Sequence, residues 1–115
     1  MLELGKTIGA VAIGRNEGER LIRCLQSLQT DLNRIVYVDS GSTDGSVEIA
    51  QNMGIIVIQL DMAKPFTAAR ARNAGLTTIL QQYPDLKYVQ FVDGDCEIQP
   101  QWLQKAFEFM QTNHN

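Results

Sequence analysis

Four short runs rich in valine and isoleucine alternate along the chain with segments that have the length and pattern of helices. The runs are Thr7–Ile13, Arg34–Asp39, Gly54–Leu60 and Leu86–Asp93. Most of them are continuously apolar, which is typical of strands covered on both faces. The regular alternation of strands and helices favours an open, mostly parallel α/β sheet with right-handed crossovers. We therefore expect a three-layer sandwich, with helices on both sides of the sheet.

The segments between the runs carry helix signals. Helices are expected over Glu17–Leu28, Asp44–Met53 and Thr67–Tyr83, with a last helix starting near Pro100. Thr43 or Asp44 suits the N-cap of the second helix, and Pro84 should end the third. Cys24 is expected to be a small core residue of the first helix. Trp102 is expected to pack under the sheet.

Length and charge exclude several classes of protein. The chain has 115 residues and a net charge of −3, with its ten basic residues spread out, so that non-specific nucleic-acid binding is disfavoured. Its apolar runs are far shorter than the roughly 20 residues that cross a bilayer. Two distant cysteines form neither a metal pair nor a disulfide scaffold. We expect one domain over residues 1–115, in a reduced, cytoplasmic setting.

Polar residues follow each strand-like run, at the edge where open parallel sheets bind ligands. Glu17 follows the first run, Asp39 ends the second, Arg72 lies well beyond the third, and Asp93-Gly94-Asp95 ends the fourth. Magnesium or manganese often takes one or two carboxylates and completes its shell with water and substrate phosphates. Asp93 and Asp95 are therefore candidate ligands for such a cation, although an Asp-Gly pair is also common in turns.

The remaining polar residues at this edge could serve either a ligand or the fold itself, and the sequence leaves both roles open. The Asp39 carboxylate can accept hydrogen bonds from a base or from ribose hydroxyls, or it can simply cap the Ser/Gly/Thr loop that follows. Glu17 is favourable to the helix dipole in any case. Arg70 and Arg72 are two positions apart on one helix, so we expect only one of them to face the ligand edge.

Taken together and in this order, the motifs resemble those of the family-2 glycosyltransferases, which are inverting enzymes with the GT-A fold. The resemblance rests on four stretches, Val11–Glu17, Val36–Ser46, Ala71–Gly75 and Phe91–Asp95. It implies that the chain is the N-terminal, nucleotide-sugar-binding part of such an enzyme. The expected fold is then a truncated GT-A sheet of the Rossmann-like type.

The resemblance also implies roles for individual residues. Glu17, Asp39 and Arg72 would line the nucleotide pocket, with the Asp39 carboxylate near uracil or another base. Asp93 and Asp95 match the Asp-x-Asp motif, in which Asp95 would ligate Mn²⁺ or Mg²⁺ and Asp93 would reach the ribose or the metal. The metal charge would offset the negative charge that develops on the departing diphosphate.

A family-2 catalytic domain is about twice as long as this chain, so the resemblance implies a fragment of a longer enzyme. The acceptor-binding half and the general base would lie outside it, and no catalytic residue is assigned within it. The implied activity of the parent is of the hexosyltransferase type, from a nucleotide diphosphate sugar, by family habit a UDP-sugar, to a hydroxyl of a sugar, lipid or protein. Self-association through an exposed sheet edge and membrane association of the full-length protein stay open.

Other classes stand as alternatives. A non-catalytic nucleotide-binding module would carry the same binding residues without a base. A phosphatase of the Asp-x-Asp type would place its acids after the first strand, and a nucleotidyltransferase would need a glycine-rich, basic loop there. A receiver domain would need an acidic pair after the first strand and a lysine after the fifth. The order of the motifs in this chain favours a glycosyltransferase over these last three.

Overall fold

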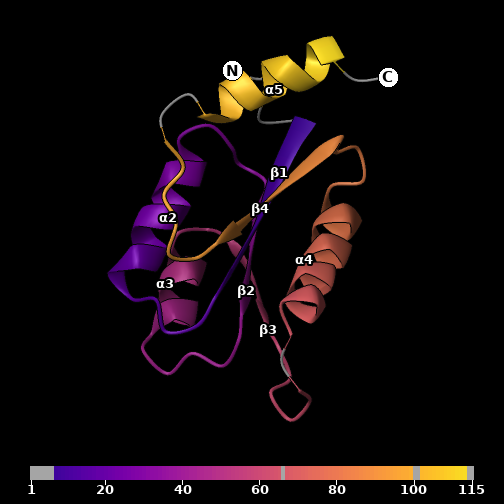
Figure 1. Ribbon diagram of the computed structural model, residues 1–115. Coiled ribbons are helices and arrows are strands. Elements are labelled where there is room, and N and C mark those ends of the chain that lie inside the picture. The colour runs from indigo at the N-terminus through magenta and orange to yellow at the C-terminus, as the bar shows by residue number, and fades with distance from the viewer. Residues whose placement is uncertain (1–6, 66, 100–101, 114–115) are drawn as a thin grey trace.

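A four-stranded sheet is flanked by helices on both faces (Figure 1). The computed structural model describes residues 7–65, 67–99 and 102–113. The strands are β1 (Ile8–Gly14), β2 (Ile35–Asp39), β3 (Ile56–Gln59) and β4 (Tyr88–Asp93), and the helices are α2 (Glu19–Gln29), α3 (Ser46–Asn52), α4 (Ala68–Gln82) and α5 (Trp102–Asn113). Helices α2 and α3 cover one face and α4 covers the other. The expected three-layer α/β sandwich is thus confirmed.

The strand order is β3-β2-β1-β4, and all neighbouring pairs are parallel. The chain therefore winds outward from β1 to β3 and then returns to the other side of β1. In the register of the sheet, Gly14 lies opposite Asp39 and Ile13 lies opposite Asp93, so the carboxyl ends of three strands meet at one edge. Open α/β sheets bind ligands outside this edge, where the winding direction reverses. Here that point lies between β1 and β4.

Alternating side chains of the strands build two separate apolar clusters. Side chains of β1 and β2 that pack with α2 belong to one cluster: Ala10, Ala12, Ile35 and Tyr37, with Leu21, Leu25 and Leu28. The residues between them point to α4 and form the other cluster: Val11, Val36 and Val38, with Ala71 and Ile79. Because neighbouring strand residues point to opposite faces, both faces of β1 and β2 are buried. This burial explains why their sequences are continuously apolar.

Helix α4 lies close to the sheet because small residues face it. A Cβ atom at Gly75 would lie 2.3 Å from Val11 Cγ1 and 3.0 Å from Val38 Cγ2. Ala71, four residues earlier and therefore on the same face of the helix, is fully buried. The small residues of the Ala-Arg-Asn-x-Gly stretch thus serve helix packing.

The start of α3 differs from the prediction. Neither Thr43 nor Asp44 is the N-cap; Gly45 takes this position with a φ of 86°. The turn requires the left-handed region, which glycine adopts without steric cost. Asp44 still helps at this helix terminus, because its Oδ1 accepts hydrogen bonds from the backbone nitrogen of Ser46 (3.0 Å) and from its hydroxyl (2.5 Å).

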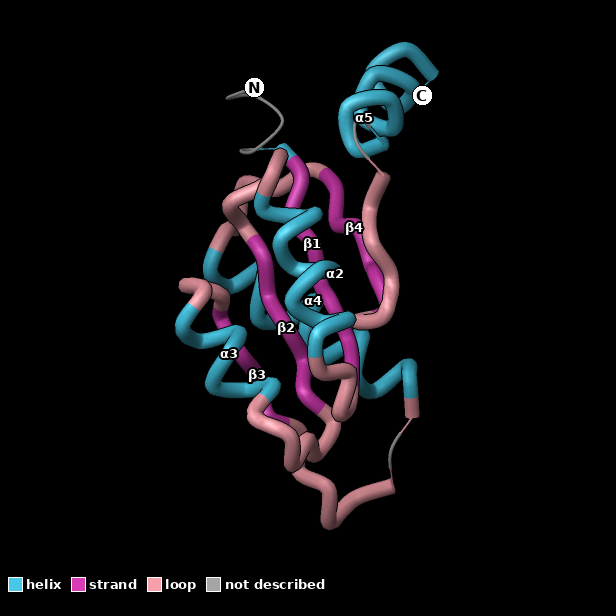
Figure 2. The backbone as a smooth tube through the Cα atoms, turned by 90° about the vertical axis from the view of Figure 1, so that its left-hand side faces the viewer, coloured by secondary structure: helices cyan, strands magenta, loops and turns pink. Residues whose placement is uncertain are grey.

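Helix α5 packs at the amino ends of the strands, away from the edge that carries Asp93 (Figure 2). Leu103, which is 1% exposed, lines a hollow of about 300 Å³ together with Ile8 and Tyr88, the first residues of β1 and β4. Trp102 is 50% exposed, so the prediction that it packs under the sheet is wrong. One step along a helix turns about 100°, and this places Leu103 inward instead. Pro100 lies outside the described residues.

Two further expectations concern Cys24 and the membrane. Cys24 is fully buried on α2, as expected for a core residue. The helices seen in the described ranges are all too short or too polar to cross a lipid bilayer.

Candidate functional site

The loops that follow β1 and β2 are tied together at the carboxyl edge of the sheet. The backbone nitrogen of Asn16 donates to Ser42 Oγ (2.9 Å), and Asn16 Oδ1 accepts from the backbone nitrogen of Thr43 (2.7 Å). The backbone nitrogen of Gly18 donates to Asp44 Oδ2 (3.1 Å). Asn16 has a φ of 51°, which asparagine tolerates better than most residues. The two loops therefore form a single unit.

Asp39 lies inside this unit, only 2% exposed. Its Oδ1 accepts hydrogen bonds from Tyr37 Oη (2.7 Å) and Ser42 Oγ (2.5 Å), and its Oδ2 accepts from the backbone nitrogen of Ser42 (2.8 Å). Burial first, and then the bond to Asp39, raise the pKa of Tyr37, so its hydroxyl remains a donor at neutral pH. A carboxylate has about four acceptor positions. Three are filled here, and these contacts fit the capping alternative for Asp39.

The turn that carries Asp93 and Asp95 is docked against β1. The backbone nitrogen of Gly94 donates to the Ile13 carbonyl oxygen (2.7 Å), and that of Cys96 donates to the Asp93 carbonyl oxygen (3.0 Å). A Cβ atom at Gly94 would lie 3.1 Å from the Ile13 oxygen, closer than side chains usually come. Both aspartates are exposed. The backbone between the two carboxylates is therefore held while the carboxylates face solvent.

Glu17 approaches the same place from the end of β1. A Cβ atom added at Gly14 would lie 3.2 Å from Glu17 Cγ, and one added at Gly94 would lie 3.5 Å from it, so Glu17 packs against both glycines. Its side chain is 20% exposed and pairs with Arg20 at 3.1 Å. The structure thus brings Glu17 next to the turn of Asp93.

The two arginines of α4 have different environments. The Arg70 guanidinium donates to the carbonyl oxygens of Asp61 (2.8 Å), Lys64 (3.4 Å) and Pro65 (3.5 Å), and so holds the loop between β3 and α4. Arg72 is exposed in the second turn of α4. The structure does not bring Arg72 among the described residues that line the pocket between β1 and β2.

The carboxylates of Asp93 and Asp95 fit a divalent cation only when other oxygens complete its shell. Within the described ranges, no group of three or more histidine, cysteine, aspartate or glutamate side chains is placed to hold a metal ion. Mg²⁺ and related ions commonly take one or two protein carboxylates and keep water and phosphate oxygens as the remaining ligands. By their chemistry the two carboxylates would fit such a cation if water or phosphate oxygens supplied its remaining ligands.

Two cysteines lie near this turn, Cys24 buried and Cys96 exposed. Cys24 Sγ lies 3.7 Å from the Asp93 carbonyl oxygen, and Cys96 Sγ lies 3.6 Å from Asp95 Oδ1. Burial, followed by Cys96 and the nearby carboxylates, raises the pKa of Cys24 to about 12. Local desolvation, followed by Asp95, raises the pKa of the Cys96 thiol. Both remain protonated at neutral pH, and the thiolate is the form that binds metals or attacks substrates.

A pocket of about 280 Å³ opens at the carboxyl ends of β1 and β2. Its described lining residues are Ile13, Gly14, Arg15, Glu17, Ser40 and Met62. Asp39 is not among them. The pocket therefore combines apolar side chains, a carboxylate and a guanidinium with Ser40, whose hydroxyl oxygen is itself buried.

Three residues of this pocket have no role in the sequence interpretation: Arg15, Ser40 and Met62. For Arg15 a signal was available, because it directly follows the first strand. For Met62 none was, because it comes from the loop after β3, and only the folded chain brings this loop beside β1.

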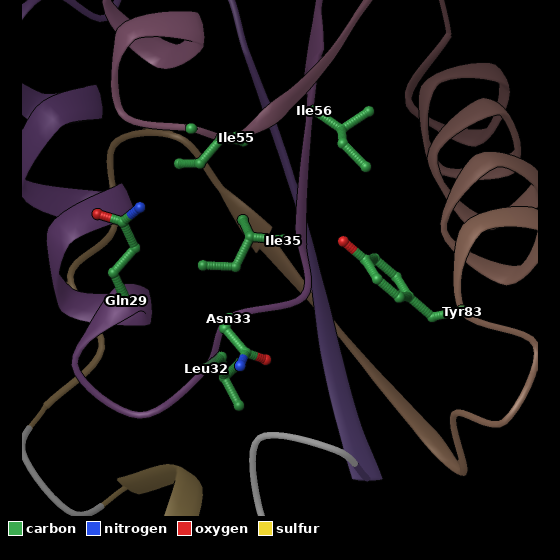
Figure 3. A pocket seen from close by; sticks show the side chains of 8 residues that line it. Gln29, Leu32, Asn33, Ile35, Ile55, Ile56 and Tyr83 are labelled. Atoms are coloured by element: carbon green, nitrogen blue, oxygen red, sulfur yellow. The ribbon is translucent and has the colours of Figure 1, made fainter.

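A larger pocket lies at the opposite edge of the sheet (Figure 3). It has a volume of about 420 Å³, and Figure 3 shows Tyr83 on the α4 side of this pocket and Gln29 on the α2 side. Ile35 and Ile56, the first residues of β2 and β3, lie between them. Ligand sites of open α/β sheets lie at the carboxyl edge. Volume alone therefore does not identify the functional site.

Comparisons with known proteins identify the family of the chain. The model of the family "Glycosyl transferase family 2" matches residues 11–115. The chain is 30% identical over 110 residues to the uncharacterized glycosyltransferase RP128 of Rickettsia prowazekii, an alignment that covers 96% of this chain and 35% of the relative. It is 28% identical over 99 residues to glycosyltransferase AglE of Haloferax volcanii, with 79% of this chain and 31% of the relative covered.

A third similar protein is the SPbeta prophage-derived glycosyltransferase SunS of Bacillus subtilis, 31% identical over 91 residues, which are 77% of this chain and 20% of SunS. The chain thus spans about a third or less of the length of these curated relatives. The family match covers most of the chain and includes every residue of the site described above. The chain therefore belongs to glycosyl transferase family 2.

Proposed function

We propose that the chain binds a nucleoside diphosphate sugar at the carboxyl edge of β1, β2 and β4, as the donor-binding part of an inverting glycosyltransferase. The reaction of the whole enzyme is then the transfer of a hexosyl group to a hydroxyl of a sugar, lipid or protein. One observation carries the proposal. The turn of Asp93 and Asp95 is docked on β1, beside the pocket that Arg15 and Glu17 line, at the point where the sheet reverses its winding.

In this proposal, different residues bind different parts of the donor. Asp93 and Asp95 hold Mn²⁺ or Mg²⁺, and the cation supplies positive charge that stabilises the departing diphosphate. Arg15 lines the pocket and offers an exposed guanidinium to the same diphosphate. Arg72 is exposed on α4, outside the pocket lining, and its contact with the nucleotide stays a prediction. Asp39 takes part only through the acceptor position that its loop leaves unfilled.

We assign no general base among the described acidic residues. Glu97, the acid nearest in sequence to the turn, pairs with Arg23 at 3.3 Å. A base must lie within hydrogen-bond reach of the acceptor hydroxyl. We therefore expect the isolated chain to bind donor but to transfer sugar inefficiently.

Calorimetric titration with UDP and with GDP, each with and without Mn²⁺, tests the proposal. We expect Mn²⁺-dependent binding of a nucleoside diphosphate, which Asp95→Asn weakens at least about tenfold because one of the two carboxylate ligands is lost. Asp31→Asn is the matched control, since it removes the same charge after α2, at the amino edge of the sheet. A folded wild-type chain that binds neither nucleotide with Mn²⁺ contradicts the proposal.

A further inference from the structure

The hydroxyl of Ser40 is buried without a partner. Ser40 is 3% exposed, and within the described part of the chain its Oγ is the one buried side-chain nitrogen or oxygen atom that has no hydrogen bond. Buried hydroxyls are nearly always hydrogen-bonded, so an exception calls for an explanation. The position of Ser40 offers one, because this residue lines the pocket of about 280 Å³ at the carboxyl ends of β1 and β2. The Oγ atom itself has almost no exposed surface, so a ligand in the pocket reaches it only after the side chain turns about its Cα–Cβ bond to another rotamer.

Asp39 and Ser40 are adjacent in sequence but differ in what they offer a ligand. The carboxylate of Asp39 already accepts three hydrogen bonds from Tyr37 and Ser42. The hydroxyl of Ser40 makes none, although the backbone nitrogen of Ser40 is fixed by a bond to the Gly14 carbonyl oxygen (3.0 Å). The unused hydrogen-bonding capacity on this strand end therefore belongs to Ser40.

Besides Arg15 and Glu17, the pocket has an apolar side that is held in place. Met62 lies against the backbone of Gly41, where a Cβ atom would be 3.0 Å from Met62 Cγ. Met62 and Ile13 both line the pocket. The loop that carries Met62 is fastened by Arg70 through three carbonyl oxygens. A thioether packs well against aromatic rings and adapts to their shape, because methionine has three rotatable side-chain bonds.

An apolar wall beside one unpaired hydroxyl matches a flat heteroaromatic ring, which has apolar faces and polar edges. We propose that Ser40 is a specificity-determining residue that hydrogen-bonds the polar edge of the nucleotide base, with Met62 packed against the ring. This inference rests on the proposed function and adds the residue that recognises the base. A serine hydroxyl both donates and accepts, so it can meet a ring carbonyl or a ring N–H group.

Titration of Ser40→Ala separates recognition of the base from recognition of the diphosphate. The ligands are UDP, GDP and pyrophosphate, each with Mn²⁺, and pyrophosphate is the ligand without a base. We expect Ser40→Ala to weaken binding of the preferred nucleoside diphosphate about tenfold, the usual effect of one lost hydrogen bond, and to leave pyrophosphate binding unchanged. Thr77→Ala, which removes an exposed hydroxyl of α4, is the control and should match the wild type.

The stability of Ser40→Ala provides a second readout. Removing a buried hydroxyl that has no partner should leave the urea midpoint of the ligand-free chain unchanged or raise it. A purely structural serine would lower it. Met62→Ala should also weaken nucleotide binding without affecting pyrophosphate, and Met62→Leu should restore most of the affinity because it restores the apolar contact.

The outcomes distinguish this inference from the proposed function. Equal nucleotide affinities of wild type and Ser40→Ala overturn the role of Ser40 while the donor site stands. Equal losses for nucleotide and pyrophosphate also overturn it, because the base would then not be the group recognised. A folded wild-type chain that binds none of the three ligands contradicts the proposed function, and this inference fails with it.

Discussion

Acidic residues end two strands at the same edge of the sheet, yet their environments are opposite. Asp39, at the end of β2, is buried and accepts three hydrogen bonds from its own chain. Asp93, at the end of β4, and Asp95 just beyond it are exposed, and neither forms an ion pair with a described residue.

The loop that follows each strand makes this difference. After β2, Ser42 folds back and donates both its backbone nitrogen and its hydroxyl to the Asp39 carboxylate. After β4, the backbone nitrogen of Gly94 is taken by the Ile13 carbonyl oxygen, so it is not available to the carboxylates beside it. A carboxylate at a strand end is therefore either held by its own loop or left exposed, according to where the next backbone donors point.

The largest effect on stability is expected at the buried carboxylate. Asp39→Ala leaves the Tyr37 hydroxyl and the Ser42 backbone nitrogen without their acceptor inside the protein. Each unsatisfied buried donor costs about 1–3 kcal/mol, so we expect a loss of about 3 kcal/mol in the free energy of unfolding. Urea denaturation measures it. Asp39→Asn keeps one acceptor oxygen and should lose less; equal stabilities of wild type and Asp39→Ala would remove the distinction between the two acidic sites.

A smaller loss is expected where the exposed turn meets β1. In Gly94→Ala the new Cβ atom would lie 3.1 Å from the backbone oxygen of Ile13, and backbone cannot move aside as a flexible side chain can. Overpacking of this kind costs about 1–3 kcal/mol. The control should exchange glycine and alanine where no backbone oxygen is close. Gly54→Ala does not serve, because Gly54 has a positive φ that alanine would strain. Ala74→Gly, at a half-buried site on α4, shows instead how much the exchange itself changes the free energy of unfolding. Unchanged stability and unchanged Mn²⁺-dependent binding in Gly94→Ala would show that the docking of the turn is unimportant.

Alkaline pH should destabilise the protein through the thiol beneath this turn. The pKa of Cys24 rises from 9.0 to about 12 on folding, with burial as the main cause. Between these values the unfolded chain loses its proton while the folded chain keeps it, so the free energy of unfolding falls as pH rises. Urea midpoints at pH 8, 9.5 and 10.5 measure this decline.

Cys24→Ala is the variant that isolates the contribution of the thiol. It should be less stable at every pH, because a cavity replaces the buried sulfur, but its stability should fall less steeply above pH 9. Tyr37, whose pKa is also raised, retains its part of the alkaline decline in this variant. Parallel pH profiles of the variant and the wild type would contradict the assignment to Cys24.

The smallest effect on stability is expected at the exposed carboxylate. Asp95→Asn removes a charge that has no ion-pair partner among the described residues, so the free energy of unfolding should change by less than about 0.5 kcal/mol. The same variant is expected to lose Mn²⁺-dependent nucleotide binding. A marked loss of stability would instead make Asp95 a structural residue like Asp39.

The sequence predicted the order of strands and helices better than it predicted local structure. The alternation of apolar runs and helical segments identified all four strands and their helices, because burial on both faces leaves a continuous apolar pattern. Local details were less accessible. Gly45 replaced the expected Thr43 or Asp44 as the N-cap, since a positive φ was needed there, and Trp102 lies outside because helix phase favours Leu103.

The sequence by itself determined that this is a parallel α/β chain with Glu17, Asp39 and the aspartate pair at one edge. That much follows because strand patterns and their order place the carboxyl ends together. Only the tertiary structure decided which of these carboxylates are exposed and which are held by their own loop. Asn16 reaches Ser42 across 26 positions, and Met62 joins a wall with Ile13. Contacts between segments so distant in sequence leave no local pattern, because they are formed by the packing of whole loops.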